Sequence, residues 1–404
     1  EEYEDVVALF EDLDADGDKD LYVGSGGVES DLNSEGYQDR VYYNNGGRFE
    51  RGGVLPRMNI NTASISTYDM DNDGLPEIFI GAGPMKDLYP YPSRSGIFKF
   101  YKDKGYVDIS EHLLPELKDL GLVRSSQWTN LDGGGPLELI VCGEWMPVTV
   151  FAYNGQRFVD ISSSIGLDKT NGWWFHVSTS DLDGDGDQDI IAGNLGLNYK
   201  YKASTKKPFE VFASDFDSNG TYDVVLAKHL ENERLVPIRG RDCTSDQMPF
   251  VAKKFPTFKN FAQSDIEDIL GEEIRNSLNY KAYQFNSVIF ENTGNYFEAR
   301  PLPMEVQWST FRSSVVADIN GDEILDIVIG GNMFPVEIET TRADGSPGWI
   351  LQGREGLSYE VLYPGETGFF IPGDVRRMEK IRIKGIPHIL VANNDGPLQV
   401  FKLN

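Results

Sequence analysis

The chain has 404 residues, of which 64 are acidic and 37 are basic, so its formal net charge at pH 7 is -27. This excess of negative charge argues against nucleic acid as a partner, because phosphate backbones are bound by basic surfaces. Aromatic residues make up 12% of the sequence, which excludes a disordered acidic chain. No apolar run reaches the roughly 18 residues of a transmembrane segment. The start, Glu1-Glu2-Tyr3, has no apolar leader, so we expect a mature chain or a fragment of a longer one.

One acidic template recurs five times along the chain. Each copy has oxygen-bearing side chains at positions 1, 3, 5 and 9 and runs into a short apolar segment. We call these copies loops one, two, four, five and six, and they start at Asp12, Asp69, Asp181, Asp215 and Asp318. Two decayed copies, loops three and seven, occupy residues 130–138 and 374–377.

The spacing of these oxygen atoms suits a hard cation, and calcium in particular, which binds six to eight oxygen ligands in a flexible cage. An EF-hand is excluded, because its loop needs a glutamate at position 12 and a helix on each side. Position 12 is apolar here, as Val23, Ile80, Ala192, Leu226 and Ile329. Solvated acidic turns are the alternative, since Asp, Asn and Gly dominate turns in any protein. Metal is favoured, because four carboxylates within nine residues repel one another unless a cation neutralises them.

The segments that flank the loops predict an all-β protein. Each loop joins two strands, and Gly-containing turns at residues 41–49, 148–158 and 287–297 predict a second hairpin in many units. Two hairpins form a four-stranded antiparallel sheet, and its repetition predicts the blades of a β-propeller. Seven loops predict seven blades. Six blades are the alternative, because the 34 residues from Asp181 to Asp215 barely hold a complete blade.

The Asp-x-Asp-x-Asp-Gly-x-x-Asp hairpin resembles the FG-GAP/VCBS repeat of integrin-alpha-type β-propellers. The segments 171–174 and 193–198 are similar to secreted bacterial relatives of cartilage acidic protein. The resemblance implies about five bound calcium ions and an extracellular setting, and it implies no reaction. In the family pattern, the side chains at positions 1, 3, 5 and 9 and the backbone carbonyl at position 7 coordinate calcium. This pattern nominates Asp12, Asp14, Asp16, Asp18 and Asp20; Asp69, Asp71, Asp73, Leu75 and Glu77; Asp181, Asp183, Asp185, Asp187 and Asp189; Asp215, Asp217, Asn219, Thr221 and Asp223; and Asp318, Asn320, Asp322, Ile324 and Asp326.

The two decayed loops are expected to differ from the others. Loop three has only Asp132 and Glu138 as carboxylates, so we expect it to hold no metal. In loop seven, Arg376 or Arg377 is expected to take the place of the cation.

The connections opposite the acidic loops are the long ones, and long loops on a rigid scaffold commonly carry function. They run from Gly24 to Asp39, from Gly81 to Gly96 and from Gly330 to Gly348. Aromatic and arginine side chains in these and neighbouring links are candidates for ligand binding. The candidates are Tyr37, Tyr89, Tyr91, Arg94, Trp145, Trp173, Tyr199 and Phe334. The alternative is packing between blades, which we favour for Trp173 and its neighbour Trp174, whereas we expect Tyr89 and Tyr91 to be exposed.

One segment interrupts the strand pattern, a helical insertion at about 241–283 within what we expect to be a single propeller domain, 1–404. Ser264 to Glu267 predicts a capping box that opens a short helix, which Gly271 ends. The insertion is interpreted as a strap on the propeller or as a docking element.

The predicted function is a non-catalytic, calcium-stabilised binding domain for a protein or a glycan. We expect it to be secreted, periplasmic or on the cell surface. The alternative is an enzyme acting on polysaccharide, a lyase or a hydrolase. The four histidines, His112, His176, His229 and His388, are scattered with no partner at a catalytic spacing, and His176 is expected in the core.

Overall fold

The structure is a computed structural model that describes residues 3–31, 34–52, 55–131, 133–337 and 340–403. In this part of the chain, the strands form seven antiparallel sheets and the helices are few and short. The all-β prediction is therefore confirmed, and the arrangement is consistent with a β-propeller. The chain divides into two compact units, the first of residues 1–123 and 201–284 and the second of residues 124–200 and 285–404.

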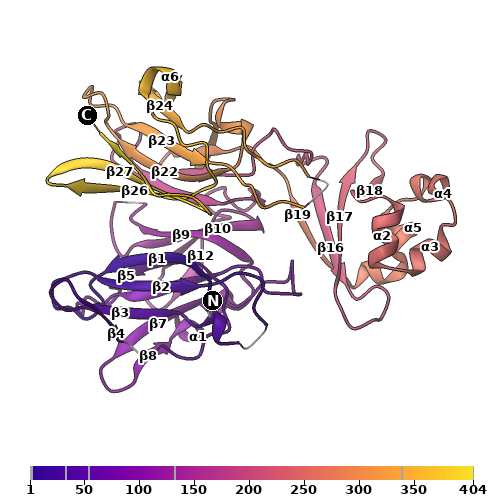
Figure 1. The fold of residues 1–404 in the computed structure, drawn as a ribbon, viewed down its shortest axis with the longest axis horizontal. Coiled ribbons are helices and arrows are strands. Elements are labelled where there is room, and N and C mark those ends of the chain that lie inside the picture. The colour runs from indigo at the N-terminus through magenta and orange to yellow at the C-terminus, as the bar shows by residue number, and fades with distance from the viewer. Residues whose placement is uncertain (1–2, 32–33, 53–54, 132, 338–339, 404) are drawn as a thin grey trace. The chain divides into compact units, whose positions relative to one another are not determined.

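The first unit begins with two four-stranded sheets whose strands follow one another in sequence (Figure 1). Their first strands, β1 and β5, lie side by side, and an apolar cluster that includes Tyr22 and Ile78 fills the space between the sheets. The strands are β1 (Asp5–Glu11), β2 (Asp20–Ser25), β3 (Arg40–Asn44) and β4 (Phe49–Gly52), then β5 (Thr62–Tyr68), β6 (Glu77–Ala82), β7 (Gly96–Tyr101) and β8 (Gly105–Asp108). The short helices are η1 (Glu35–Tyr37), α1 (Ser110–Leu113) and η2 (Pro115–Asp119).

The first unit also contains a sheet of order β18-β17-β16-β19, which carries the helical segment. Figure 1 shows helices α2 to α5 grouped beside these strands. The strands are β16 (Phe209–Ser214), β17 (Asp223–His229), β18 (Leu235–Pro237) and β19 (Leu278–Ala282), and the helices are α2 (Arg241–Gln247), α3 (Phe250–Lys254), α4 (Phe258–Gln263), α5 (Ile266–Leu270) and η3 (Gly271–Arg275). Phe212 and Val225 pack with apolar residues of these helices, so the helical segment covers one face of the sheet.

The helical insertion differs from its prediction in two details. Its helical residues end at Arg275, because Leu278–Ala282 pairs with β16 as an edge strand. The capping box at the start of α5 is formed by Asp265 and Asp268, one residue later than predicted. The side chain of Asp265 accepts a hydrogen bond from the backbone N–H of Asp268, and the Asp268 carboxylate accepts one from the N–H of Asp265.

The second unit contains four sheets. Their successive strands β10, β14, β22 and β26 lie close to one another in that order. The strands are β9 (Leu122–Thr129), β10 (Glu138–Met146), β11 (Thr149–Tyr153), β12 (Phe158–Asp160) and β13 (Gly172–Trp173); β14 (His176–Ser180), β15 (Asp189–Gly193), β20 (Val288–Asn292) and β21 (Phe297–Pro301); β22 (Phe311–Ala317), β23 (Asp326–Gly331), β24 (Trp349–Arg354) and β25 (Ser358–Leu362); and β26 (Val375–Ile383), β27 (Ile386–Asn393) and β28 (Gln399–Lys402). The remaining short helices are η4 (Val306–Trp308) and α6 (Pro364–Thr367).

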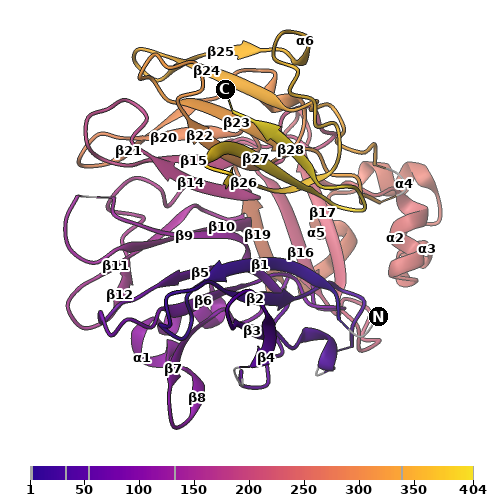
Figure 2. The ribbon, with the colours of Figure 1, turned by 60° about the vertical axis from the view of Figure 1, so that its left-hand side comes forward.

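One sheet of the second unit is interrupted in sequence. Figure 2 shows β14 and β15 beside β20 and β21, and the register pairs Ile191 of β15 with Ile289 of β20. The chain between these two paired strands contains the whole of the sheet β16–β19. Loops four and five therefore belong to different sheets. The sequence of the sheet with loop five is inserted between the second and third strands of the sheet with loop four.

Candidate functional site

The acidic loops share a backbone conformation that is built from local hydrogen bonds. In loop one, the Asp12 carboxylate accepts from the backbone N–H groups of Asp16 and Gly17 at 3.2 and 3.0 Å. Ala15 and Gly17, at positions 4 and 6, have φ angles of 62° and 95°. Position 6 is therefore best filled by glycine, which tolerates this left-handed region. The same pattern recurs in loop five, where Asp215 accepts from the N–H of Asn219 and of Gly220, and loop four has a variant in which Asp181 accepts from the N–H of Gly184 and of Gly186.

The carboxylate at position 9 is buried and joins three segments of its sheet. One oxygen of Asp20 accepts from the N–H of Leu13 at 2.8 Å, and the other accepts from the N–H of Asn44, on the third strand, at 2.9 Å. Asp189 makes the corresponding bonds with Leu182 and Asn292. Position 9 thus has a structural role of its own, whether or not a cation is bound.

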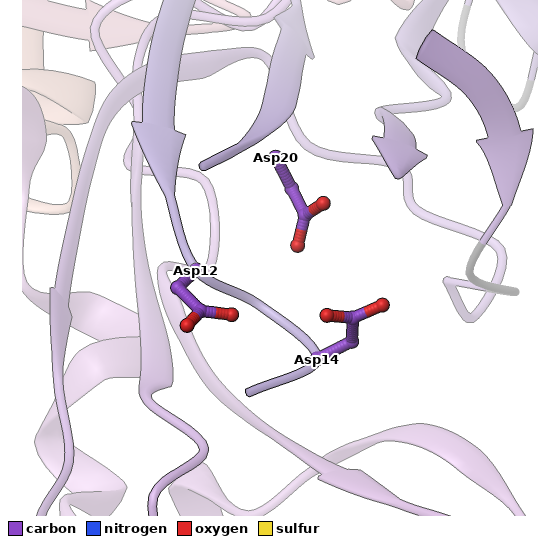
Figure 3. Close-up of side chains that lie close together, drawn as sticks. All are labelled: Asp12, Asp14 and Asp20. Atoms are coloured by element: carbon purple, nitrogen blue, oxygen red, sulfur yellow. The ribbon is translucent and has the colours of Figure 1, made fainter. Parts of the chain in front are cut away.

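Carboxylates converge in four of the loops. Figure 3 shows the carboxylates of Asp12, Asp14 and Asp20 pointing toward one another from the hairpin between β1 and β2. In each group, one oxygen of every residue lies within 4.8 Å of the others. The other groups are Asp69, Asp71 and Glu77; Asp181, Asp183 and Asp185; and Asp215, Asp217 and Asp223. An all-oxygen donor set of this kind suits calcium.

In loops one, four and five, burial and mutual repulsion oppose ionisation of the carboxylates. Burial and the neighbouring charge of Asp185 raise the pKa of Asp187 to about 6, and burial raises the pKa of Asp189 to about 6. The pKa values of Asp14, Asp183 and Asp223 are raised for the same reasons. A divalent cation would relieve this repulsion, so the residues of these three loops fit calcium.

Loop two differs, because a lysine lies among its carboxylates. The Lys99 ammonium is 2.7 Å from Asp71 Oδ2, 2.9 Å from Asp73 Oδ2 and 2.6 Å from Glu77 Oε1. The hydrogen bond from Lys99 lowers the pKa of Asp73. Part of the positive charge that calcium would supply is already present in this loop.

The remaining loops have weaker or different donor sets. In loop six, the Asn320 side-chain amide donates to Asp322 Oδ2 at 2.8 Å, and the carboxylates of this loop form no convergent group. Asp132 of loop three lies outside the described residues, whereas Glu138 is buried and accepts from the N–H of Leu131. In loop seven, Arg376 lies 3.0 Å from Asp374, which is the contact expected of an arginine in the cation's place.

Two of the predicted ligand-binding residues are not available to a ligand in this structure. The side chain of Tyr37 is fully buried, and its hydroxyl donates to the carbonyl of Ser30. Trp145 is 3% exposed and packs edge-on against Trp173, with ring centroids 5.1 Å apart. Trp173 is itself half-buried and Trp174 is fully buried, as expected of core packing.

The other candidates are partly accessible, although several are held by neighbours. Tyr91, expected to be exposed, stacks at 4.5 Å on Tyr222 of loop five and donates its hydroxyl to the carbonyl of Ala213. Arg94 is exposed and lies 2.8 Å from Asp108. The guanidinium of Arg342 covers the ring of Phe334 at 4.4 Å. Tyr89 and Tyr199 are half-buried.

A surface hollow in the second unit has no counterpart among the predicted ligand residues. It has a volume of about 400 Å³ and is lined by Leu197, Asn198, Met304, Gln307 and Trp308. Trp308 is 39% exposed and Met304 is 60% exposed, and the backbone N–H groups of Leu197 and Asn198 donate to the carbonyl of Gln307. The sequence gives no sign that Trp308 and Leu197, about a hundred positions apart, meet here.

The described histidines offer no accessible catalytic pair. His176 is 5% exposed and its Nε2 lies 2.7 Å from Ser314 Oγ and 3.2 Å from Ser178 Oγ. Its ring stacks on Phe311, and burial lowers its pKa to about 3. A neutral, enclosed imidazole of this kind agrees with the predicted core role of His176.

Comparisons with known proteins support the repeat. A family model described as the FG-GAP-like repeat matches residues 12–80 and 130–192, so the chain carries FG-GAP-like repeats, as the resemblance in the sequence predicted. No curated protein sequence matches the chain. The similarity to cartilage acidic protein relatives stays a prediction.

Several solved structures are similar over nearly all of this chain. An Agrocybe aegerita lectin that recognises non-reducing terminal N-acetylglucosamine is 12% identical, with 98% of this chain and 80% of that chain covered and a TM-score of 0.43. Sqt1 of Saccharomyces cerevisiae is 11% identical, with coverages of 96% and 85% and a TM-score of 0.42. The exotype rhamnogalacturonan lyase YesX is 15% identical, with coverages of 98% and 71% and a TM-score of 0.32.

The described helices are all short, and none has the length and apolar character needed to span a bilayer.

Proposed function

We propose that this chain is a calcium-stabilised β-propeller domain with a non-catalytic binding role outside the cytoplasm, directed at a protein or a glycan. The observation that carries the proposal is the convergence of carboxylates in hairpin loops of FG-GAP type. We propose calcium in loops one, four and five, where carboxylates converge and the pKa values of Asp14, Asp183 and Asp223 are raised by burial and by neighbouring carboxylates. Calcium there would fix the turn between the first two strands of each sheet.

The sheet order favours a propeller of six blades that follow one another along the chain. The sheet β16–β19 is then an insertion between the second and third strands of the fourth blade, and not a blade of its own. This arrangement is the six-bladed alternative that the short spacing between loops four and five had left open. The whole chain remains one propeller domain in this proposal.

The hollow around Trp308 is the proposed ligand surface. An exposed indole beside the apolar side chains of Leu197 and Met304 offers a flat contact for a sugar ring or for an apolar side chain of a partner. Asn198 and Gln307 add polar groups that can orient a ligand.

The metal part of the proposal is tested by thermal unfolding with a chelator and with millimolar calcium. Each ion that binds only the folded chain adds about 2.7 kcal/mol at a hundredfold excess over its dissociation constant. Asp183→Asn should lower the midpoint in calcium and should remove one bound ion by native mass spectrometry. Asp168→Asn, an exposed aspartate of the same unit outside the loops, is the matched control. An equal midpoint with and without calcium would contradict the metal assignment.

The binding part is tested on a glycan array and by capture of proteins from the extracellular fraction, both with calcium present. Trp308→Ala should abolish the strongest signal. It should also lower the midpoint of unfolding somewhat, because the Trp308 ring packs edge-on against Trp349 with ring centroids 5.7 Å apart, so binding is compared well below the midpoints of both proteins. Tyr296→Ala removes a comparably exposed aromatic ring from the turn after β20 and serves as control. Cleavage of a polysaccharide on the array, detected by new reducing ends or unsaturated products, would support the enzyme alternative.

A further inference from the structure

Lys99 lies on the third strand of its sheet, directly beside the end of loop two. The register pairs Ile78 with Phe98, so Lys99 stands next to Glu77, the position 9 carboxylate of the loop. Its ammonium contacts three carboxylates of loop two at 2.6 to 2.9 Å. The Lys99 side chain is only 13% exposed, so the ammonium is enclosed by the loop and is not a mobile surface group.

The same strand position carries no positively charged side chain in three other sheets that have an acidic loop between their first two strands. Tyr43 stands there beside Asp20, Glu291 beside Asp189 and Gln352 beside Asp326, as the adjacent pairs in each register show. Loop two therefore differs from loops one, four and six by a lysine on the third strand of its sheet.

Glu77 is adapted to this neighbour. Loops one, four, five and six have Asp at position 9, whereas loop two has the longer Glu. Its Oε2 keeps the bond to the backbone N–H of Met70 at 2.8 Å, as position 9 does elsewhere. Its Oε1 accepts from the Lys99 ammonium at 2.6 Å, where the corresponding oxygen of Asp20 accepts from a backbone N–H of the third strand.

We infer that Lys99 is the built-in cation of loop two, and that it excludes calcium from this hairpin. Three short charge-assisted hydrogen bonds hold the ammonium in place, and such bonds are about twice as strong as those between neutral groups. A calcium ion among the same oxygens would lie within a few ångströms of the ammonium and would be repelled by it. The ion pairs of Lys99 thus hold the hairpin between β5 and β6 without a metal ion. This inference rests on the proposed function, which assigns calcium to loops one, four and five.

The test counts bound calcium on the full chain by isothermal titration and by native mass spectrometry. Lys99→Met keeps an unbranched side chain that is one atom shorter, removes the charge, and should add one calcium ion to the number bound by the wild type. Lys86→Met, which removes a lysine paired with Asp31 outside the loops, should leave the number unchanged. Asp71→Asn in the wild-type background should also leave it unchanged, and this measurement stands even where the Lys99 variant does not fold.

The outcomes separate this inference from the proposed function. An unchanged count in folded Lys99→Met would overturn the inference, as would the loss of one ion in Asp71→Asn. A wild type that binds no calcium would contradict the proposed function, yet one ion gained by Lys99→Met would still support the role of Lys99. Chelator should lower the stability of folded Lys99→Met more than that of the wild type, because only the variant would hold its second hairpin through an ion.

Discussion

The buried carboxyl group of Asp39, which follows the first long connection, should make the stability of the protein depend on pH. Its carboxylate is 2% exposed, accepts from the Tyr22 hydroxyl at 2.8 Å and from the backbone N–H of Ser25 at 2.7 Å, and also contacts Thr62 Oγ1. Burial raises the pKa of Asp39 to about 7, although these hydrogen bonds and the Arg40 charge oppose the shift. We predict that replacing Asp39 by Asn makes the stability of the protein less dependent on pH.

The sign follows from the direction of the shift. The pKa of Asp39 is higher in the folded chain than the ordinary aspartate value of 3.8, which we take for the unfolded chain, so between these two values the folded state binds more protons than the unfolded state. The contribution of Asp39 to stability is therefore lost as the pH rises through this range. With one pKa unit equal to about 1.4 kcal/mol, the loss between pH 5 and pH 8 is roughly 2–3 kcal/mol. Asp39→Asn has no carboxylate to ionise and escapes this loss.

The assay is urea unfolding in calcium followed by circular dichroism. Tryptophan fluorescence reports only on the second unit, because all six tryptophans lie at residues 124–200 or 285–404. The quantity of interest is the difference in unfolding free energy between the variant and the wild type, which should move by roughly 2–3 kcal/mol in favour of the variant from pH 5 to pH 8. Glu50→Gln, an exposed charge removed from the same sheet, controls for net charge. A difference that stays constant over this range would show that Asp39 is ionised throughout, and would refute the reasoning.

Two further predictions concern the loops. Tyr91→Phe should cost about 0.5–1.5 kcal/mol of unfolding free energy by circular dichroism, because it removes the bond to Ala213, whereas the exposed Tyr101→Phe should cost almost nothing. An equal cost for both would contradict the contact of Tyr91. Gly186→Ala should cost roughly 1–2 kcal/mol in a thermal melt, since position 6 has a φ of 102° and open space around an added Cβ, so that only backbone strain acts. Gly365→Ala meets equally open space without a positive φ, and a cost as large as that of Gly186→Ala would refute the strain argument.

The acidic loops could be predicted from the sequence because their determinants are local. Asp12 bonds to backbone groups four and five residues later, and Asp20 bonds to one seven residues earlier, so a nine-residue template contains most of the interactions that shape the hairpin. The apolar run after each template then predicts the second strand. The core position of His176 and Trp174 also followed from their place within an apolar segment.

Features that depend on distant segments could not be predicted in this way. Lys99 reaches loop two through strand register, and nothing near residue 99 resembles a ligand motif. Tyr37 and Trp145 are buried, the latter against Trp173 of another strand, although aromatic residues in long loops suggested exposure. Likewise, the pairing of β15 with β20 across the inserted sheet has no local signal, since short apolar strands are compatible with many partners.

The inserted sheet has consequences for how the chain folds and how it could be edited. Its entry strand β16 and its exit strand β19 are paired with each other, with Phe209 opposite Ala282. At the other end of the connection, the N–H of Gly196 donates to the carbonyl of Phe285 at 2.8 Å. If the connection from Gly193 to Val288 were flexible, pairing β15 with β20 would carry the entropy cost of closing a long loop. Because the two ends of the inserted sheet lie beside each other, the loop that has to close is effectively a short one. The segment also contacts the rest of the first unit, as Tyr222 and Ala213 do Tyr91, so replacing it by a short linker would keep the closure of the host sheet short but would remove these contacts.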